Sequence, residues 1–132
     1  MERLVYISTS RAVPDRQLVD DILAQSRRNN RREGLTGLLV VCGRRFLQVL
    51  EGQSEALDAA YGRIKADTRH FAMVELGRKQ ISKRAFAGWD MGCELINGAD
   101  LNGFVDELTS GVDDADLQAQ FRSFVEIQRK AA

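Results

Sequence analysis

The sequence has little cysteine and histidine, and its formal net charge is zero. The two cysteines, Cys42 and Cys93, lie far apart and form no C-x-x-C pair, so they predict buried reduced thiols and neither a zinc site nor a redox dithiol. The single histidine, His70, has no second histidine at metal-ligand spacing and no serine or cysteine motif to pair with. We therefore expect no bound metal and no hydrolytic catalysis.

Other absences narrow the function further. Basic and acidic residues number 19 each, so no overall field draws the protein onto nucleic acid or an anionic membrane. Nowhere does an uncharged apolar run reach the ~18 residues that would span a bilayer. The sequence contains no P-loop and no G-x-G-x-x-G motif. We expect a cytoplasmic protein that binds neither nucleic acid nor membrane.

The 132 residues, 44% of them hydrophobic, can bury one core and leave no material for a second full domain. Alternation and helical periodicity predict six elements in the order strand, helix, strand, strand, helix, strand. They are expected at Leu4–Ser8, Asp15–Asn29, Leu38–Cys42, Arg45–Glu51, a helix capped by Ser54, and Phe71–Leu76. This order is typical of an α+β ferredoxin-like sandwich, with the first and third strands adjacent and both helices on one face.

The remaining sequence predicts a cap on this core. A short fifth strand through Met91 and Cys93 would complete a βαββαββ order, and Trp89 would share its face with Met91 and compete with it for one pocket. Two amphipathic segments, Leu101–Leu108 and Leu117–Gln128, are expected to cover the opposite face of the sheet. We therefore expect a core over residues 1–96 and a helical cap over 97–132 within one structural unit.

A polar side chain stands inside an apolar strand. Alternation puts Gln48 on the face of Phe46 and Leu50, which the helices should cover. An unsatisfied buried amide costs about 1–3 kcal/mol, so Gln48 must have partners, and Tyr6 on the neighbouring strand is the obvious one. The pair is either a structural hydrogen bond or part of a ligand site.

Side chains on the two helices also have either a structural role or a role in a ligand site. Asn29 and Asn30 could bind the edge of a flat heterocycle such as a pyrimidinedione, or simply cap the first helix. Ile22 and Ile64 could form an apolar slot for a planar ring, or pack as core. A basic cluster at the end of the first helix could meet the phosphates of a nucleotide, or be a solvated helix end. It consists of Arg27, Arg28, Arg31 and Arg32.

Six motifs follow one another without interruption over roughly residues 2–96. They are Leu4–Ser8, Ser26–Asn30, Gly34–Leu39, Phe46–Gly52, Asp67–His70 and Arg84–Met91. Together they resemble the BLUF family of flavin photoreceptors, and the combination is far more specific than any one motif. One departure is Asp90, because the family commonly has a small polar or another neutral residue between the tryptophan and the methionine.

The resemblance implies a non-covalently bound FAD, with FMN as the alternative, lying between the two helices. Ile22 and Ile64 would flank its ring, and Asn30 would bind the O4 and N3 edge. The resemblance places Asn29 and Arg69 nearer O2, and Gln48 between Tyr6 and the N5 and O4 atoms. Further contacts are implied for Ser26, Arg27, Phe46, Asp67 and His70.

The resemblance also implies a mechanism. Light would drive an electron from Tyr6 to the flavin with a proton passing through Gln48, and recombination would leave the Gln48 amide rotated or tautomerised, with a stronger hydrogen bond to flavin O4. Ser26, Trp89 and Met91 would pass the change to the C-terminal helices. A carboxylate at Asp90 would affect this output step by altering strand pairing or the exchange of Trp89 with Met91.

Three classes of function are compatible with such a chain: a blue-light sensor, a colourless ferredoxin-like binding module, and a flavin-dependent reductase. A slot closed by Ile22 and Ile64 leaves little room for a reductase substrate, so we expect a photosensory flavoprotein and not an enzyme. The balanced charge argues against RNA recognition by the same fold. Without room for an effector domain, the protein should signal through an unidentified partner protein and form a homodimer or larger homo-oligomer.

Overall fold

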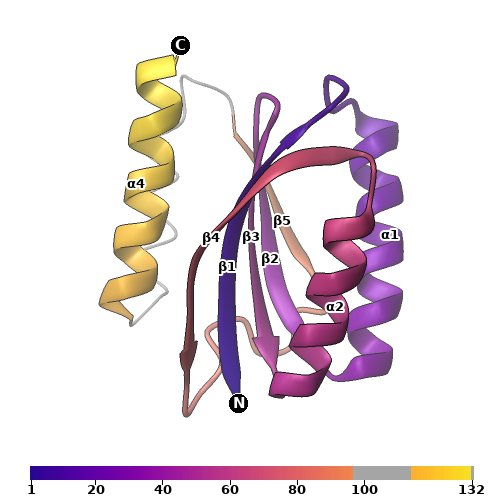
Figure 1. Ribbon diagram of the computed structural model, residues 1–132, viewed down its shortest axis with the longest axis vertical. Helices are drawn as coiled ribbons and strands as arrows, with labels where there is room; N and C mark the ends of the chain where they lie inside the picture. Colours follow the sequence, from indigo (N-terminus) through magenta and orange to yellow (C-terminus); the bar gives the residue numbers. More distant parts are fainter. Residues whose placement is uncertain (97–113, 132) are drawn as a thin grey trace.

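The computed structural model describes residues 1–96 and 114–131 and arranges them in three layers (Figure 1). Two helices lie on one face of a five-stranded sheet and a third helix lies on the other face. The elements in chain order are β1 (Glu2–Ser10), α1 (Arg16–Glu33), β2 (Thr36–Cys42), β3 (Arg45–Gly52), α2 (Ser54–Ala66), β4 (His70–Gln80), β5 (Gly92–Ile96) and α4 (Ala115–Ala131). No helix in this described part is long and apolar enough to cross a membrane.

The sheet has the strand order β4-β1-β3-β2-β5. β1 runs antiparallel to both β3 and β4, and β2 and β3 form a hairpin whose turn includes Gly43 in the left-handed conformation, with φ of 58°. β5 pairs in parallel with β2 at the edge. The predicted adjacency of the first and third strands, and the predicted fifth strand, are therefore confirmed.

Side chains that alternate along the central strands build two separate cores. On β1, Leu4 belongs to the core under α1 and α2, whereas Val5 belongs to the core under α4. This period of two is the pleat of a strand that is covered on both faces. The helix side also buries Leu23, Phe46 and Leu57. Both faces of the sheet are therefore available for buried interactions, and the pocket described below belongs to the helix side.

Two helix boundaries differ from the predictions. α1 continues to Glu33 and ends where Gly34 takes the left-handed conformation, with φ of 71°, so the predicted end at Asn29 was wrong. Arginine is a good helix former and is favourable near a helix C-terminus, which explains the extra turn. Ser54 is the first helical residue of α2, and Gln53 holds the cap position without a side-chain bond, so the predicted Ser54 cap was also wrong.

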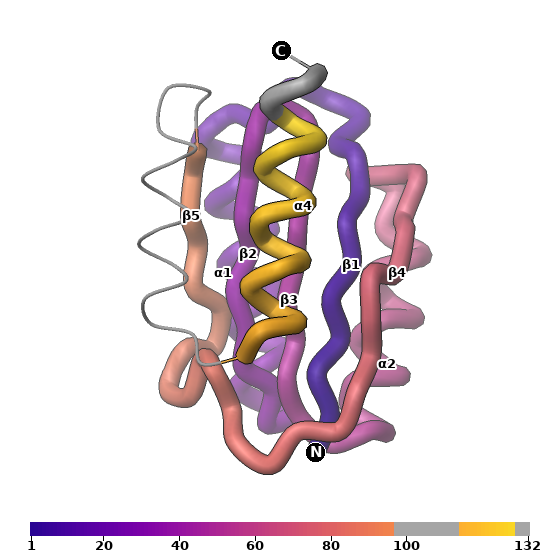
Figure 2. The backbone as a smooth tube through the Cα atoms, turned by 90° about the vertical axis from the view of Figure 1, so that its left-hand side faces the viewer, coloured from indigo at the N-terminus to yellow at the C-terminus, as the bar shows by residue number. Residues whose placement is uncertain are grey.

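The C-terminal part of the chain covers the sheet as predicted where the structure describes it. α4 runs along the open face of the sheet (Figure 2) and buries Leu117, Phe121, Phe124 and Val125 against it. The second predicted cap helix, Leu101–Leu108, lies outside the described residues. β5 begins at Gly92, so Trp89 and Met91 precede the strand and the prediction that they share one strand face was wrong.

Candidate functional site

A pocket opens between α1, α2 and the helix side of the sheet. The pocket is partly open to solvent, and both apolar and polar side chains line it. Its lining includes all the predicted flavin contacts except Tyr6 and Arg27: Ile22, Ser26, Asn29, Asn30, Phe46, Gln48, Ile64, Asp67, Arg69 and His70. Four lining residues were not predicted: Gln25, Leu50, Ala60 and Arg63.

Gln48 lies in this pocket and bridges two other buried side chains. Tyr6 and Gln48 face each other in the β1–β3 register, and the Tyr6 hydroxyl donates to Gln48 Oε1. Gln48 Nε2 in turn donates to Met91 Sδ, 3.6 Å away. Tyr6, Gln48 and Met91 are all buried, so the amide is satisfied as the sequence requires, and both of its ends are engaged within the protein.

The Tyr6 phenol stays protonated in this environment. Burial raises its pKa far above the ordinary value of a tyrosine, and the nearby Tyr61 and Asp67 add to the effect. The Tyr61 ring lies beside Tyr6 with a centroid distance of 5.7 Å. A neutral phenol that donates to a neutral amide keeps its proton until the ring is oxidised.

The asparagines at the end of α1 do not cap the helix. The backbone carbonyl of Asn30 accepts the N–H groups of Gly34 and Leu35, so the helix ends without help from its side chain. The Asn30 amide instead donates to the carbonyl of Asp90 at 2.6 Å. The Asn29 side-chain oxygen, Oδ1, accepts from the Arg32 guanidinium at 3.1 Å. Because Gly34 holds the cap position and neither asparagine side chain bonds a backbone group at the end of the helix, the capping alternative is wrong. Both side-chain amides border the pocket.

Two arginines of the basic cluster hold the segment that carries Met91. Arg27 donates to the carbonyl of Met91 at 3.0 Å, and Arg31 forms an ion pair with Asp90 at 2.9 Å. With Asn30, these residues attach the Asp90–Met91 turn to α1. Asp90, which departs from the family pattern, thus has a partner on the same helix.

Met91 occupies the place beside Gln48, and Trp89 does not. Met91 is 2% exposed, whereas Trp89 is 48% exposed and packs on Phe86 with a ring-centroid distance of 5.7 Å. Ser26 lines the pocket on the α1 side. The weakly accepting sulfur therefore receives the Gln48 amide in this arrangement.

An ion pair and a histidine line the end of the pocket near β4. Arg69 pairs with Asp67 at 2.6 Å and lowers the pKa of that carboxyl, and it also donates to Gln25 at 2.8 Å. His70 Nε2 donates to the carbonyl of Ile64 at 2.6 Å, and Nδ1 lies 2.8 Å from the Ser8 hydroxyl. Both ring nitrogens are engaged within the fold. Among the described residues, no three His, Cys, Asp or Glu side chains gather where they could hold a metal.

The pocket fits a flavin ring. Its walls are apolar side chains, including Ile22, Ile64 and Phe46, which suit the faces of a planar ring. Its polar rim offers the amides of Asn29, Asn30 and Gln48. An amide presents both donors and an acceptor, as the alternating N–H and carbonyl groups of a pyrimidinedione edge require.

A sequence model of the BLUF family, described as sensors of blue-light using FAD, matches residues 1–92. The chain belongs to the BLUF family. It is therefore a flavin-based blue-light sensor domain, and the Tyr6–Gln48 hydrogen bond fits the tyrosine–glutamine pair of that family. The BLUF resemblance inferred from the six motifs is thus confirmed.

Solved BLUF structures share the fold over nearly the whole chain. The dark-state structure of the BLUF protein BlrB has a TM-score of 0.74 with 27% identity, and the match covers 95% of both chains. BlrP1 of Klebsiella pneumoniae, solved with FMN and cyclic diGMP, has a TM-score of 0.80 with 26% identity; the match covers 95% of this chain and 34% of that one.

Curated BLUF relatives include much longer proteins. The photoactivated adenylate cyclase subunit beta of Euglena longa is 31% identical over 94 residues, which is 69% of this chain. The matched part amounts to 11% of the length of that cyclase subunit. The similarity therefore concerns the sensor domain and not the cyclase activity.

Proposed function

We propose that this BLUF protein reports blue light by reorienting the Gln48 amide, with Tyr6 as electron donor and Met91 as the first residue to respond. The observation that carries the proposal is the double engagement of one buried amide: its oxygen accepts from Tyr6 and its nitrogen donates to Met91. The position of this hydrogen-bonded pair at the pocket supports the photochemical roles proposed for Tyr6 and Gln48.

Bound flavin supplies the absorption of blue light and, once excited, the demand for one electron. Tyr6 meets that demand. Because its phenol is buried and its pKa is raised, Tyr6 is neutral before it is oxidised, and an oxidised phenol holds its proton weakly. The proton passes to Gln48 Oε1, which already accepts that hydrogen bond. Return of the electron and the proton restores the Tyr6 phenol.

The Gln48 amide then remains in a second arrangement. Rotation of the amide by half a turn exchanges Oε1 and Nε2, so the nitrogen faces Tyr6 and the oxygen faces Met91. A thioether sulfur has no hydrogen to donate, so the exchanged amide loses its bond to Met91. The planar amide can point either its oxygen or its nitrogen at Tyr6, which makes the change a switch between two discrete states.

The family points to FAD as the chromophore, whereas BlrP1 has been solved with FMN. In this chain, Ile22 and Ile64 would flank the ring, and the amides of Asn29 and Asn30 would hold its polar edge. Ser26, Phe46, Asp67, Arg69 and His70 would complete the contacts from the pocket wall. Arg27 holds the Met91 carbonyl and would position the ring only indirectly.

The signal leaves the site through the Asp90–Met91 turn and reaches α4, and we propose that it ends in a partner protein or in a homo-oligomer. Exposed apolar side chains on the β4 edge of the sheet support an association surface there: Phe71 is 42% exposed and Val74 is 52% exposed. The chemistry described requires no second substrate, so the domain acts as a sensor and not as an enzyme.

The test is to purify the full chain in the dark, identify any released flavin, and record the visible spectrum before and after blue light. The proposal predicts a yellow protein whose flavin band moves to longer wavelength and recovers in darkness. A protein that stays colourless when FAD and FMN are supplied, or one that turns over a nicotinamide donor without a light-induced shift, would contradict it.

A further inference from the structure

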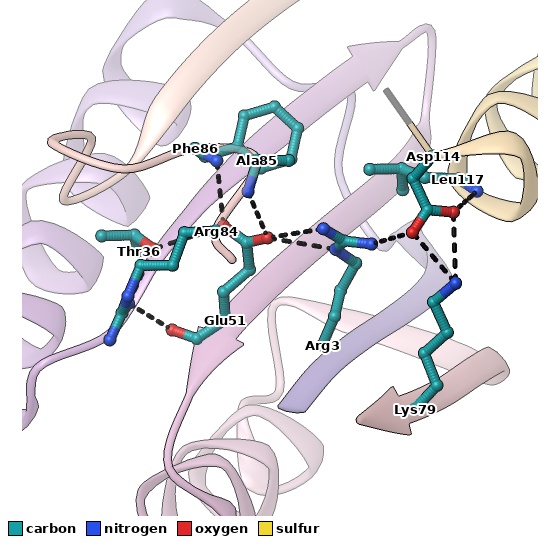
Figure 3. Close-up of polar contacts among 9 residues, drawn as sticks. All are labelled: Arg3, Thr36, Glu51, Lys79, Arg84, Ala85, Phe86, Asp114 and Leu117. Atoms are coloured by element: carbon teal, nitrogen blue, oxygen red, sulfur yellow. Dashed lines mark hydrogen bonds and ion pairs between the residues drawn. The ribbon is translucent and has the colours of Figure 1, made fainter. Parts of the chain in front are cut away.

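A buried ionic network lies on the opposite face of the sheet from the pocket (Figure 3). Its centre is Glu51, which follows Gln48 by three residues on β3 and therefore points to the α4 side. Arg3 pairs with Glu51 in the β1–β3 register and binds it with two nitrogens, at 3.0 and 3.1 Å. Glu51 is fully buried and Arg3 is 5% exposed.

Glu51 also holds the chain segment that leads to Met91. Its carboxylate accepts the backbone N–H groups of Ala85 at 2.8 Å and Phe86 at 3.0 Å (Figure 3). Phe86 belongs to the core under α4, and Met91, five residues later, belongs to the core under α1 and α2. The segment thus passes from one face of the sheet to the other, with Glu51 holding one end and Gln48 contacting the other.

The third member of the network, Asp114, directly precedes α4. Asp114 accepts from Arg3 at 2.8 Å, and its carboxylate also accepts the backbone N–H of Leu117 at 3.1 Å, which caps the first turn of the helix. Partial burial opposes ionisation, but Lys79, the Leu117 N–H and Arg3 together lower the pKa of Asp114 well below its ordinary range. The carboxylate is therefore charged and fixed between the sheet and the helix.

We infer that Glu51, Arg3 and Asp114, here named the Arg3 bridge, couple the Gln48–Met91 switch to the N-terminal turn of α4. The inference rests on the proposed light-driven switch and adds the route by which it reaches the helix. When the segment ending at Met91 shifts, Ala85 and Phe86 withdraw donors from Glu51. Arg3 then binds Glu51 more closely and Asp114 less closely, and the α4 cap loosens.

A network of this kind responds in steps. Both Glu51 oxygens already accept hydrogen bonds: Oε2 from Arg3 and the Ala85 N–H, and Oε1 from the Phe86 N–H and, at 3.4 Å, from the Thr36 hydroxyl. Two Arg3 nitrogens bind Glu51 and the third binds Asp114. Glu51 is 0% exposed, so a lost donor must be compensated through its remaining protein partners, and Arg3 is the charged one among them. A displacement at Phe86 is therefore passed to Asp114 and not absorbed locally.

The experiment compares hydrogen exchange of the first turn of α4 in the flavin-loaded full chain, in darkness and under blue light. The test variant is Asp114→Asn, because asparagine still caps a helix but has no charge to hold Arg3. Asp114→Ser, which also caps, is a second test variant if the first folds poorly. The control is Asp116→Asn, two residues away, 75% exposed and paired with Lys79.

We expect the wild type and Asp116→Asn to exchange faster around Leu117 and Gln118 under light. In the Asp114 variants the flavin band should still shift, while the difference between light and dark exchange in α4 is lost. A shift of the flavin band without faster α4 exchange in the wild type, or a full light effect in both Asp114 variants, would overturn the coupling. Absence of any flavin shift in the wild type would instead overturn the proposed function.

Discussion

Gln48 Nε2 donates to Met91 Sδ across 3.6 Å, while the other end of the same amide accepts from Tyr6. Tyr6 is a central-strand residue, and Met91 belongs to the turn that α1 holds through Arg27 and Asn30. One side chain thus joins the buried Tyr6 phenol to the segment that leads to the far face of the sheet.

Replacing Tyr6 with phenylalanine should abolish the light-induced shift and leave the flavin bound. Phenylalanine keeps the packing but offers neither an O–H proton nor an easily oxidised ring. The measurement is the visible spectrum before and after blue light. Tyr61→Phe is the matched control, because Tyr61 packs 5.7 Å from Tyr6 and is not its partner in the hydrogen bond to Gln48. A persistent, reversible shift in Tyr6→Phe would contradict the role of Tyr6.

Replacing Met91 with leucine should preserve the shift and slow the return to the dark state. Leucine fills a similar volume but accepts no hydrogen bond, so the dark arrangement of Gln48 loses a stabilising contact that the rotated arrangement lacks already. A weak hydrogen bond of about 0.5–1 kcal/mol corresponds to roughly a two- to fivefold decrease in the rate of recovery. The measurement is the time course of recovery in darkness, with Met73→Leu on β4 as the control. Unchanged or faster recovery in Met91→Leu would count against the Gln48–Met91 contact.

Asn30→Ala should weaken flavin binding more than Asn29→Ala. Asn30 is 4% exposed and satisfies the carbonyl of Asp90, whereas Asn29 is half-buried and bonds to an exposed arginine. In the proposed complex the Asn30 amide also holds the polar edge of the ring, and the loss of a buried polar partner there costs about 1–3 kcal/mol, or roughly 5- to 150-fold in the dissociation constant. Quenching of flavin fluorescence on titration measures both variants. Equal losses, or a larger loss in Asn29→Ala, would show that Asn30 does not have this role.

The Asp67–Arg69 pair should make stability depend on pH in the acidic range. Arg69 lowers the pKa of Asp67 in the folded state, so the stabilisation is fully present above the unfolded pKa of about 4. It is lost as the pH falls through the lower, folded pKa. Urea unfolding at a series of acidic pH values should show a smaller fall in the free energy of unfolding for Asp67→Asn than for the wild type.

The control for that pH series is Asp20→Asn, since Asp20 is 57% exposed and pairs only loosely with Arg16, at 3.6 Å. It should follow the wild type throughout. If Asp67→Asn and the wild type lose stability in parallel, the Arg69 pair contributes nothing to the acid sensitivity.

The local sequence pattern was sufficient to predict the order of the central strands and the Tyr6–Gln48 pair. The order of elements predicts adjacent first and third strands, and the period of two predicts that Gln48 faces the helices. Their combination places Tyr6 opposite Gln48, as the register confirms. Gln25 was missed although its spacing offered a signal: it lies one helical turn before Asn29 on the same face of α1.

Contacts between distant segments could not be predicted in this way. Met91 is placed beside Gln48 partly by a bond from Arg27, 64 residues away, and nothing in the local pattern distinguishes this from a buried Trp89. The burial of Glu51 also depends on contacts with distant segments. A lone carboxylate in a strand is typical of a solvent-facing position, and Glu51 lies inside because Arg3, the Thr36 hydroxyl and two backbone N–H groups from a later loop satisfy it.

The most direct test of the central claim is the light-minus-dark visible spectrum of flavin-loaded Gln48→Leu beside that of the wild type. Leucine keeps a side chain of similar length in the pocket but has no amide to rotate. We predict that the wild type shows a reversible shift of the flavin band to longer wavelength and that Gln48→Leu binds flavin and shows none. A reversible shift of wild-type size in Gln48→Leu would contradict the claim that reorientation of the Gln48 amide reports the light.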